Sequence, residues 1–166
     1  MKIILNYLIY ILGLLRNGNH FDPIIIYIWR RSKVAYERIL QRIAFIENQL
    51  KLLKNWAPEN REEFLADLKL QAAVERNMQN IIEAIMQICT QLVKYFNLGP
   101  PTSEDSILEL LEQKLDNYNL IKEFKKFRNF LVHQYLKVES GKVYNYLKPF
   151  LEDVVLVIEE FRKIIS

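Results

Sequence analysis

The chain has 166 residues, with 23 Lys and Arg against 20 Asp and Glu, and a formal net charge of +3. This length fits one ordinary domain with its own core, and so small a net charge does not by itself indicate a nucleic-acid partner. Cys89 is the only cysteine, which excludes an intrachain disulfide and fits a reducing cytoplasm, where we expect the protein to reside. The four glycines and the abundant Leu, Ile, Glu, Lys and Gln favour helices.

Residues 1–31 form an apolar N-terminal extension that differs in composition from the rest of the chain. Its first apolar run ends at Arg16, which is shorter than the roughly 20 residues of a membrane-crossing helix. No small-residue cleavage site of the signal-peptide kind follows this run. Three interpretations stay open: an extra helix or strand docked on the domain, a translated stretch upstream of the true start, or a membrane or export signal. We place the domain at residues 32–166.

A regular helical period begins at Ser32, which is a suitable N-cap. Apolar residues then recur at steps of three and four as far as about Trp56, which predicts one amphipathic helix. Its inward stripe consists of Ile39, Ile43, Ile46, Leu50 and Leu53.

A second stripe follows the break at Pro58, with acidic residues at the expected helix start. It consists of Phe64, Leu68, Gln71, Glu75, Met78, Ile82, Ile85, Cys89, Leu92 and Phe96. The span is either one long helix or two helices with a break near Asp67, and Gly99 with the prolines after it ends the helix. Glu75 marks either the point where the stripe leaves the core or meets a partner charge, or a catalytic carboxylate.

The C-terminal half predicts three more helices. Thr102 with Asp105 is a capping signature that opens a short helix, and residues 118–133 carry the next apolar stripe. Residues 138–142 read as a turn before a last helix, which Pro149 either kinks or effectively begins. Because no alternating strand pattern occurs in residues 32–166, we predict an all-α domain, an antiparallel bundle of four to five helices.

Residues 128–135 combine a cation, an amide, an imidazole and a phenol within two turns: Arg128, Asn129, His133 and Tyr135. At about 100° per residue, Arg128 and Tyr135 lie roughly 20° apart, while Asn129 and His133 share a neighbouring face. Histidine carries protons near neutral pH, and the arginine fork suits a phosphate that gains charge during reaction. This combination fits cleavage of RNA phosphodiester bonds.

Such cleavage usually needs two proton carriers, but His20 and His133 are the only histidines, and His20 lies in the N-terminal extension. A twofold dimer would supply two copies of the Arg-His helix to one composite cleft. The alternative is that the pair only caps a helix.

The motif lies in the most basic stretch of the chain, since residues 122–142 contain six Lys and Arg and two Glu. With Tyr118, Tyr135, Tyr144 and Tyr146 nearby, the stretch could hold a single RNA strand by phosphate contacts and stacking. An equally good interpretation is a solvated face with half-buried tyrosines. We expect no cofactor, because the sequence has no zinc-ligand cluster and no glycine-rich phosphate loop.

The pattern Arg128-Asn129-x-x-Val132-His133-x-Tyr135 resembles the Arg-Asn-x3-His-x-Tyr signature of the HepT-like branch of the HEPN superfamily. Residues 71–76 and 82–84 resemble a second block of that family. The resemblance covers about residues 33–165, includes the helix order, and leaves out residues 1–31.

The resemblance implies a dimeric toxin of a type VII HEPN/MNT toxin–antitoxin system, acting as a metal-independent endoribonuclease on RNA. It implies that Arg128 and His133 are catalytic and that Asn129 supports them. It also implies that the antitoxin, a minimal nucleotidyltransferase, modifies Tyr135 with AMP. The added phosphate would neutralise the arginine. Glu75 then becomes a residue that orients Arg128 or lines the dimer groove.

Two other functions stay open. The same groove could belong to a non-catalytic subunit that binds a nucleotide or a nucleotidyltransferase through Arg128 and His133. A membrane-attached protein that uses residues 1–31 is the less expected alternative.

Overall fold

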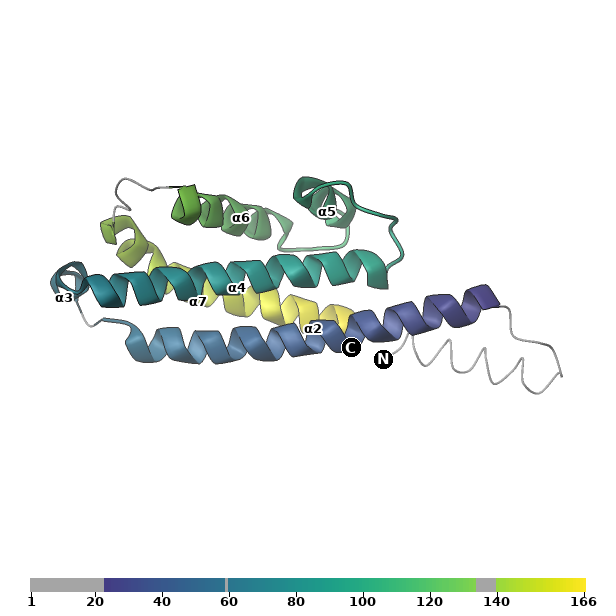
Figure 1. Ribbon diagram of the computed structural model, residues 1–166, viewed down its shortest axis with the longest axis horizontal. Helices are drawn as coiled ribbons and strands as arrows, with labels where there is room; N and C mark the ends of the chain where they lie inside the picture. Colours follow the sequence, from purple (N-terminus) through teal and green to yellow (C-terminus); the bar gives the residue numbers. More distant parts are fainter. Residues whose placement is uncertain (1–22, 59, 134–139) are drawn as a thin grey trace.

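The computed structural model describes residues 23–58, 60–133 and 140–166, and all regular structure in these ranges is helical (Figure 1). The helices are α2 (Pro23–Trp56), α3 (Arg61–Ala66), α4 (Leu68–Tyr95), α5 (Glu104–Leu111), α6 (Tyr118–His133) and α7 (Ser140–Ile165). Four of them are long, and α3 and α5 have only six and eight residues. The predicted all-α bundle is confirmed. None of the described helices has a stretch long and apolar enough to span a lipid bilayer.

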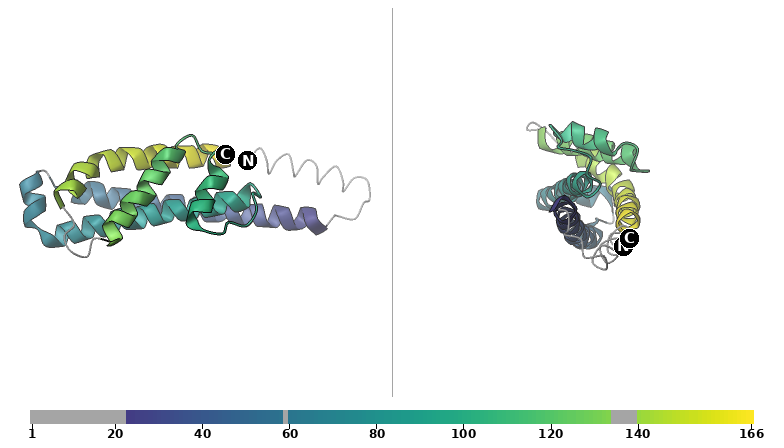
Figure 2. Two further views of the ribbon diagram at one scale, coloured as in Figure 1. Left: turned by 90° about the horizontal axis from the view of Figure 1, so that it is seen from above. Right: turned by 90° about the vertical axis from the view of Figure 1, so that its right-hand side faces the viewer.

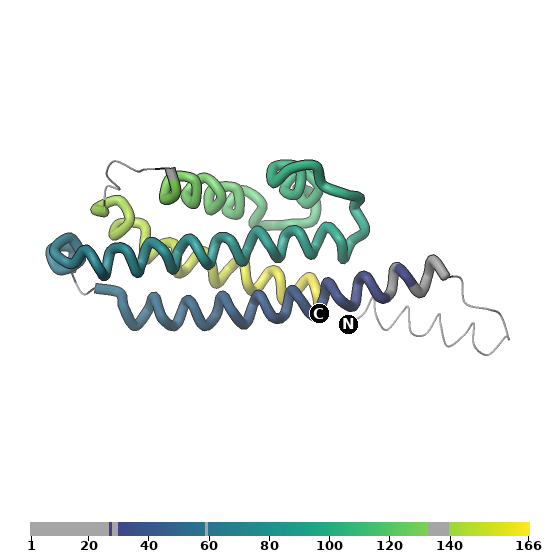
Figure 3. Tube along the Cα trace, viewed as in Figure 1, coloured from purple at the N-terminus to yellow at the C-terminus, as the bar shows by residue number. Residues whose placement is uncertain are grey.

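Helix α4 is the central element of the bundle. α2 runs alongside it in the opposite direction, and the chain path from α2 through α3 back along α4 can be followed in Figure 3. α7 runs lengthwise beside this pair, whereas α6 crosses obliquely over α4 with α5 at its side (Figure 2). α6 therefore presents the residues after Tyr118 above the middle of α4.

The core forms between the apolar stripes of α2, α4 and α7, joined by Phe124 of α6. The five predicted inward residues of α2 are all buried, as the period of the helix requires. In the second stripe the prediction that Leu68 faces the core is wrong, since its side chain is 77% exposed. A helix break directly before Leu68 resets the phase of the stripe, so that the first residue of α4 points outward.

Helix α2 begins nine residues before the predicted N-cap. It starts at Pro23, and proline fits the first helical position because its missing N–H has no acceptor there. Ser32 consequently lies inside the helix, and the expected cap at this residue is wrong. The boundary that we place between residues 31 and 32 falls within α2.

The open choice near Asp67 is settled in favour of two helices. Asp67 has an extended backbone (φ −105°, ψ 94°), and its carboxylate accepts hydrogen bonds from the N–H groups of Lys69 and Leu70 at 2.9 and 3.0 Å. It is the N-cap of α4. The N-cap of α3 is Asn60, whose side-chain oxygen accepts from Glu63 N–H at 2.8 Å.

Gln71, a polar member of the second stripe, is a satisfied core residue. Its amide nitrogen donates to the carbonyls of Phe64 and Leu65 at 2.9 and 3.0 Å, and its amide oxygen accepts from the Ser140 hydroxyl at 2.6 Å. The side chain therefore ties the beginnings of α4 and α7 to the end of α3.

Two boundaries in the C-terminal half differ from prediction. The N-cap of α5 is Ser103, which forms a capping box with Ser106 in place of Thr102 with Asp105. α7 begins at Ser140, so residues 140–142 are helical and not part of a turn, and Pro149 lies inside the helix. Residues 138 and 139 lie outside the described ranges. Both errors are small shifts at helix ends, where local capping competes with the apolar period.

Candidate functional site

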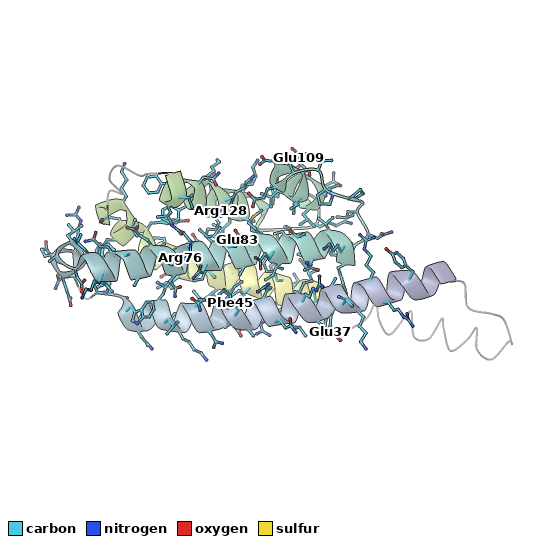
Figure 4. The ribbon with its side chains drawn as sticks, viewed as in Figure 1. Glu37, Phe45, Arg76, Glu83, Glu109 and Arg128 are labelled. Atoms are coloured by element: carbon cyan, nitrogen blue, oxygen red, sulfur yellow. The ribbon has the colours of Figure 1, made fainter. Side chains whose placement is uncertain are left out.

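Arg128 lies on α6 where this helix crosses α4 (Figure 4). Its guanidinium forms a two-pronged contact with Glu104 of α5: Nη1 is 2.9 Å from Oε1, and Nη2 is 2.7 Å from Oε2. Nη1 also donates to Oε2 of Glu83 on α4 at 2.9 Å. The arginine side chain is 18% exposed. Arg128 is thus held between carboxylates from two neighbouring helices.

The hydrogen bond with Glu104 is the main cause that raises the pKa of Arg128 above its ordinary value. The charges of Glu104 and Glu83 add to this effect, and partial burial opposes it. The guanidinium is therefore a permanent cation with a fixed orientation. Two parallel N–H···O contacts of this kind define the plane of the fork as well as its position.

The first turn of α5 supplies the acidic half of this contact. Ser103 caps the helix, which places Glu104 and Asp105 at its positive end, where carboxylates are stabilised. Lys125, one turn before Arg128, reaches the same pair, with Nζ 2.5 Å from Asp105 Oδ1 and 3.8 Å from Glu104 Oε2. The two helices are joined by a small ion-pair network.

This network changes the expected basic patch. Lys125 and Arg128 are paired with carboxylates that lie 20 or more residues away in the chain, and Lys126 pairs with Glu123 at 2.7 Å. Three of the six cations in this stretch are therefore compensated by carboxylates in space. Of the four tyrosines expected nearby, the described ones, Tyr118, Tyr144 and Tyr146, are half-buried. The interpretation of half-buried tyrosines therefore holds for them.

The remaining motif residues are described to different extents. Asn129 is exposed on α6, about 100° around the helix from Arg128. His133 is the last residue of α6, and its side chain lies outside the described part of the structure. Tyr135 also lies outside the described residues. Arg128 and Asn129 are therefore the motif residues whose side chains the structure places.

Glu75 is half-buried on α4, and desolvation raises the pKa of its carboxyl. Among the described residues, the carboxylates that contact Arg128 are Glu83 and Glu104, and Glu75 is not one of them. Neither of these two glutamates is predicted as a site residue from the sequence alone. Glu83 lies in the block 82–84 that carries the family resemblance, which is a usable signal. Glu104 is visible in the sequence only as part of a helix cap.

A shallow hollow of about 490 Å³ lies on the other side of α6. Its lining includes the rings of Phe127, Phe130 and Tyr146 and the charged residues Glu123, Lys126 and Asp153. Phe127 lies 5.8 Å from Phe130 and 4.6 Å from Tyr146, measured between ring centroids. Desolvation, aided by Asp153, raises the pKa of the Tyr146 phenol to about 12. At neutral pH the hollow thus offers aromatic rings and a protonated phenol.

Among the residues that the structure describes, no three His, Cys, Asp or Glu side chains are grouped as a metal ion requires. The fold and the site define an all-helical protein whose candidate centre is an arginine fixed by carboxylates of two other helices.

The chain matches the family model described as "Ribonuclease HepT-like" over residues 46–161 and belongs to that family. The match includes α4, α5 and α6, and with them Arg128 and the two glutamates that contact it, Glu83 and Glu104. The resemblance seen in the motif is thereby confirmed.

Two curated relatives are similar in sequence. "Probable sucrose-phosphatase 3b" of Arabidopsis thaliana is 33% identical over 101 residues, which are 61% of this chain but only 20% of that protein. "Putative RNase YutE" of Bacillus subtilis is 29% identical over 122 residues, covering 69% of this chain and 78% of the relative. The chain therefore spans a fifth of the first relative and most of the second.

A solved structure extends the likeness to the fold. The tri-AMPylated HEPN toxin of Shewanella oneidensis, in complex with MNT antitoxin, superimposes with a TM-score of 0.67 at 25% identity. The alignment covers 76% of this chain and 97% of that toxin.

Proposed function

We propose that this protein is the toxin of a type VII HEPN/MNT toxin–antitoxin pair and cleaves RNA as a metal-independent endoribonuclease. The observation that carries the proposal is Arg128, a cation fixed by Glu104 and Glu83 on the helix that ends at His133. Membership of the HepT-like family supports the activity. The similar toxin bound to MNT antitoxin supports a nucleotidyltransferase partner.

In the proposed reaction, His133 of one subunit takes the proton of a ribose 2′-hydroxyl, and the 2′-oxygen attacks the adjacent phosphorus. The bond from phosphorus to the 5′-oxygen breaks, and that oxygen receives a proton from a second histidine. The products are a 2′,3′-cyclic phosphate and a free 5′-hydroxyl. Arg128 binds the non-bridging oxygens, where negative charge grows in the transition state.

The second histidine comes from a twofold-related copy of the chain. In the proposed dimer, two copies of α6 meet in one cleft, which contains two Arg128 and two His133 side chains. In the proposed site Asn129, which is exposed on α6 one turn before His133, supports the histidine. Since Glu83 and Glu104 make the orienting contacts, the role left for Glu75 is to line the groove.

The carboxylates around Arg128 have a defined part in this scheme. They fix the plane of the fork before RNA arrives, so that binding does not have to order a flexible side chain. A phosphate then shares or replaces one of the existing contacts, because both terminal nitrogens already donate to carboxylates. Orientation is gained at the cost of some attraction for the phosphate.

Regulation follows from Tyr135, two residues beyond His133 in the chain. The partner nucleotidyltransferase transfers AMP to the phenol oxygen, and the new phosphodiester places a negative charge and a nucleotide in the proposed cleft. That charge occupies Arg128 and excludes RNA. The AMPylated state of the similar HEPN toxin supports this step.

The proposal is tested by incubating the purified chain with a 5′-labelled single-stranded RNA in EDTA. Cleavage should fall at least about a hundredfold in His133→Ala and in Arg128→Ala, because each removes a group that acts in the transition state. Lys126→Ala is the matched control, since it removes from the same helix a cation whose salt bridge, among the described residues, is to Glu123 and not to Glu83 or Glu104. RNA left intact by the unmodified protein, or cleaved equally by His133→Ala, would refute the ribonuclease.

A non-catalytic subunit is the second candidate, and the full pairing of the Arg128 fork favours it. In that case the proposed cleft at Arg128 and His133 binds a nucleotide or the nucleotidyltransferase itself. The same experiment separates the two functions: intact RNA, together with partner binding that is lost in Arg128→Ala, identifies the binding subunit.

A further inference from the structure

A second groove, outside the Arg128 network, lies between the first part of α2 and the last part of α4. Its volume is about 570 Å³. The lining includes Tyr27, Arg30, Arg31 and Arg38 from α2, and Gln91 and Lys94 from α4. Four of these six residues are cations, and no carboxylate lines the groove.

These cations differ from those on α6. In the described part of the chain, no carboxylate forms a salt bridge with Arg30, Arg31, Arg38 or Lys94. Among the described residues these four cations have no carboxylate partner, and a phosphate is a suitable counter-ion for them. Arginine binds phosphate with two parallel hydrogen bonds, and three arginines along one helix can contact successive phosphates of a strand.

The helical period places one residue of the groove, Lys94, on the side of α4 that carries the contact with Arg128. Glu83, which contacts Arg128, and Lys94 are eleven residues apart, which puts them within about 20° of each other around α4 and about 16 Å apart along it. Figure 4 shows Glu83 on α4 below Arg128 of α6. A strand bound at Arg128 and extended along α4 would reach the groove after a short distance.

We propose that this groove binds the phosphodiester backbone of the RNA substrate, away from the bond that is cut. The inference rests on the proposed function and adds a place where the substrate is held. Tyr27, whose side chain is 64% exposed, provides a ring on which a base can stack. Affinity then comes mainly from the groove, because the fork at Arg128 is already compensated by carboxylates.

An anionic membrane surface is a different class of ligand for the same charges. The position of the groove between two helices and the spacing of Lys94 from Glu83 along α4 favour a strand over a flat bilayer. Membrane binding is therefore treated as an outcome that overturns the inference.

The test measures binding without cleavage, using the full chain and a fluorescein-labelled, 2′-O-methylated single-stranded RNA in fluorescence anisotropy at several salt concentrations. Arg31→Ala/Arg38→Ala should weaken binding on the order of tenfold. It should also lower the salt slope by roughly 1.4, about 0.7 for each phosphate that is no longer neutralised. Lys51→Ala/Lys54→Ala is the matched control, because it removes the same charge from exposed positions of α2 outside the groove.

Equal affinity of the two double variants would overturn the inference, and so would an unmodified protein that does not bind the RNA. It would also be overturned if Arg31→Ala/Arg38→Ala kept its RNA affinity and lost binding to phosphatidylglycerol vesicles. Because the probe cannot be cleaved, failure of the ribonuclease is detected separately: a chain that cuts no RNA but shows the tenfold weaker binding in the variant supports the groove and not the proposed reaction.

Discussion

Arg128 contacts Glu104 and Glu83 although these residues lie 24 and 45 positions away in the chain. A partly exposed ion pair contributes little to stability, roughly 1 kcal/mol or less. Its value at this site is geometric, because the two-pronged contact with Glu104 fixes the direction of the arginine fork. We therefore expect the contact to matter more for turnover than for folding.

Replacing Glu104 with Gln tests this expectation. The variant keeps the size of the side chain but loses the negative charge and one of the two acceptor oxygens. If Glu104 positions Arg128, kcat for RNA cleavage falls about tenfold, while KM is unchanged or lower because a competing charge is gone. The melting temperature should stay close to that of the unmodified protein.

The matched control is Asp105→Asn, which removes a carboxylate from the same turn of α5 that pairs with Lys125 and not with Arg128. Equal losses of kcat in both variants would show that the whole ion-pair network matters only for packing, and positioning by Glu104 would be rejected.

For single residues, the sequence predicts which side chains of the motif share one helix, but not which carboxylates contact Arg128. The residues of the motif are contiguous, so their spacing on one helix can be computed from the helical period. The partners of Arg128 depend on how α4 and α5 pack against α6, and no local pattern contains that information. In the sequence, Glu104 stands out only as part of the capping segment of a short helix. A capping segment does not indicate a contact with Arg128.

Helix α6 is held at its start by a single buried carboxylate. Glu160 of α7, 8% exposed, accepts hydrogen bonds from the backbone N–H groups of Asp116 and Asn117 and from the Asn117 side chain. These donors precede the first turn of α6, so Glu160 fixes the point from which the helix that carries Arg128 extends.

Burial, with the charge of Glu160 as a smaller cause, raises the pKa of Cys89 to about 12.

Glu160→Ala should destabilise the protein by about 3 kcal/mol, because it leaves the donors of three part-buried hydrogen bonds without their acceptor. Urea unfolding followed by circular dichroism measures this change. Glu159→Ala, at the exposed neighbouring position, should stay within about 0.5 kcal/mol of the unmodified protein. A small effect of Glu160→Ala, similar to that of Glu159→Ala, would show that water satisfies these donors equally well.

Most elements were predictable, and their ends were less so. The period of the α2 stripe and the proline-rich segment after α4 mark helices that packing then reinforces. The predictions that Ser32 and Thr102 are N-caps were wrong. Serine and threonine are common at positions that suit a cap, and which residue caps the helix depends on where the preceding segment enters it. The exposure of Leu68 follows from the helix break at Asp67. The apolar pattern of the sequence alone did not decide whether this break occurs.

For the whole molecule, the proposed composite cleft makes a quantitative prediction about subunits. A heterodimer of the unmodified chain with an Arg128→Ala/His133→Ala chain contains one intact Arg-His pair. If cleavage needs two histidines in one cleft, this heterodimer should have less than about a tenth of the activity of the unmodified dimer. Two different affinity tags allow its purification, and light scattering should give twice the 19.9 kDa mass of the chain.

Half of the unmodified activity would indicate two independent sites, and full activity would show that one pair suffices. Either result would contradict the composite cleft while leaving the ribonuclease itself intact. Subunit arrangement could not be derived from the helical period, since that period describes which residues face the core of one chain.

The contact between Glu160 and the start of α6 also affects when the site can form during protein synthesis. Glu160 follows His133 by 27 positions, so a growing chain synthesises the whole of α6 well before the carboxylate that fixes its start. The contact that fixes the start of α6 cannot form until residue 160 has been synthesised. For a protein proposed to cut RNA, this order of synthesis delays assembly of the complete site until most of α7 has been synthesised.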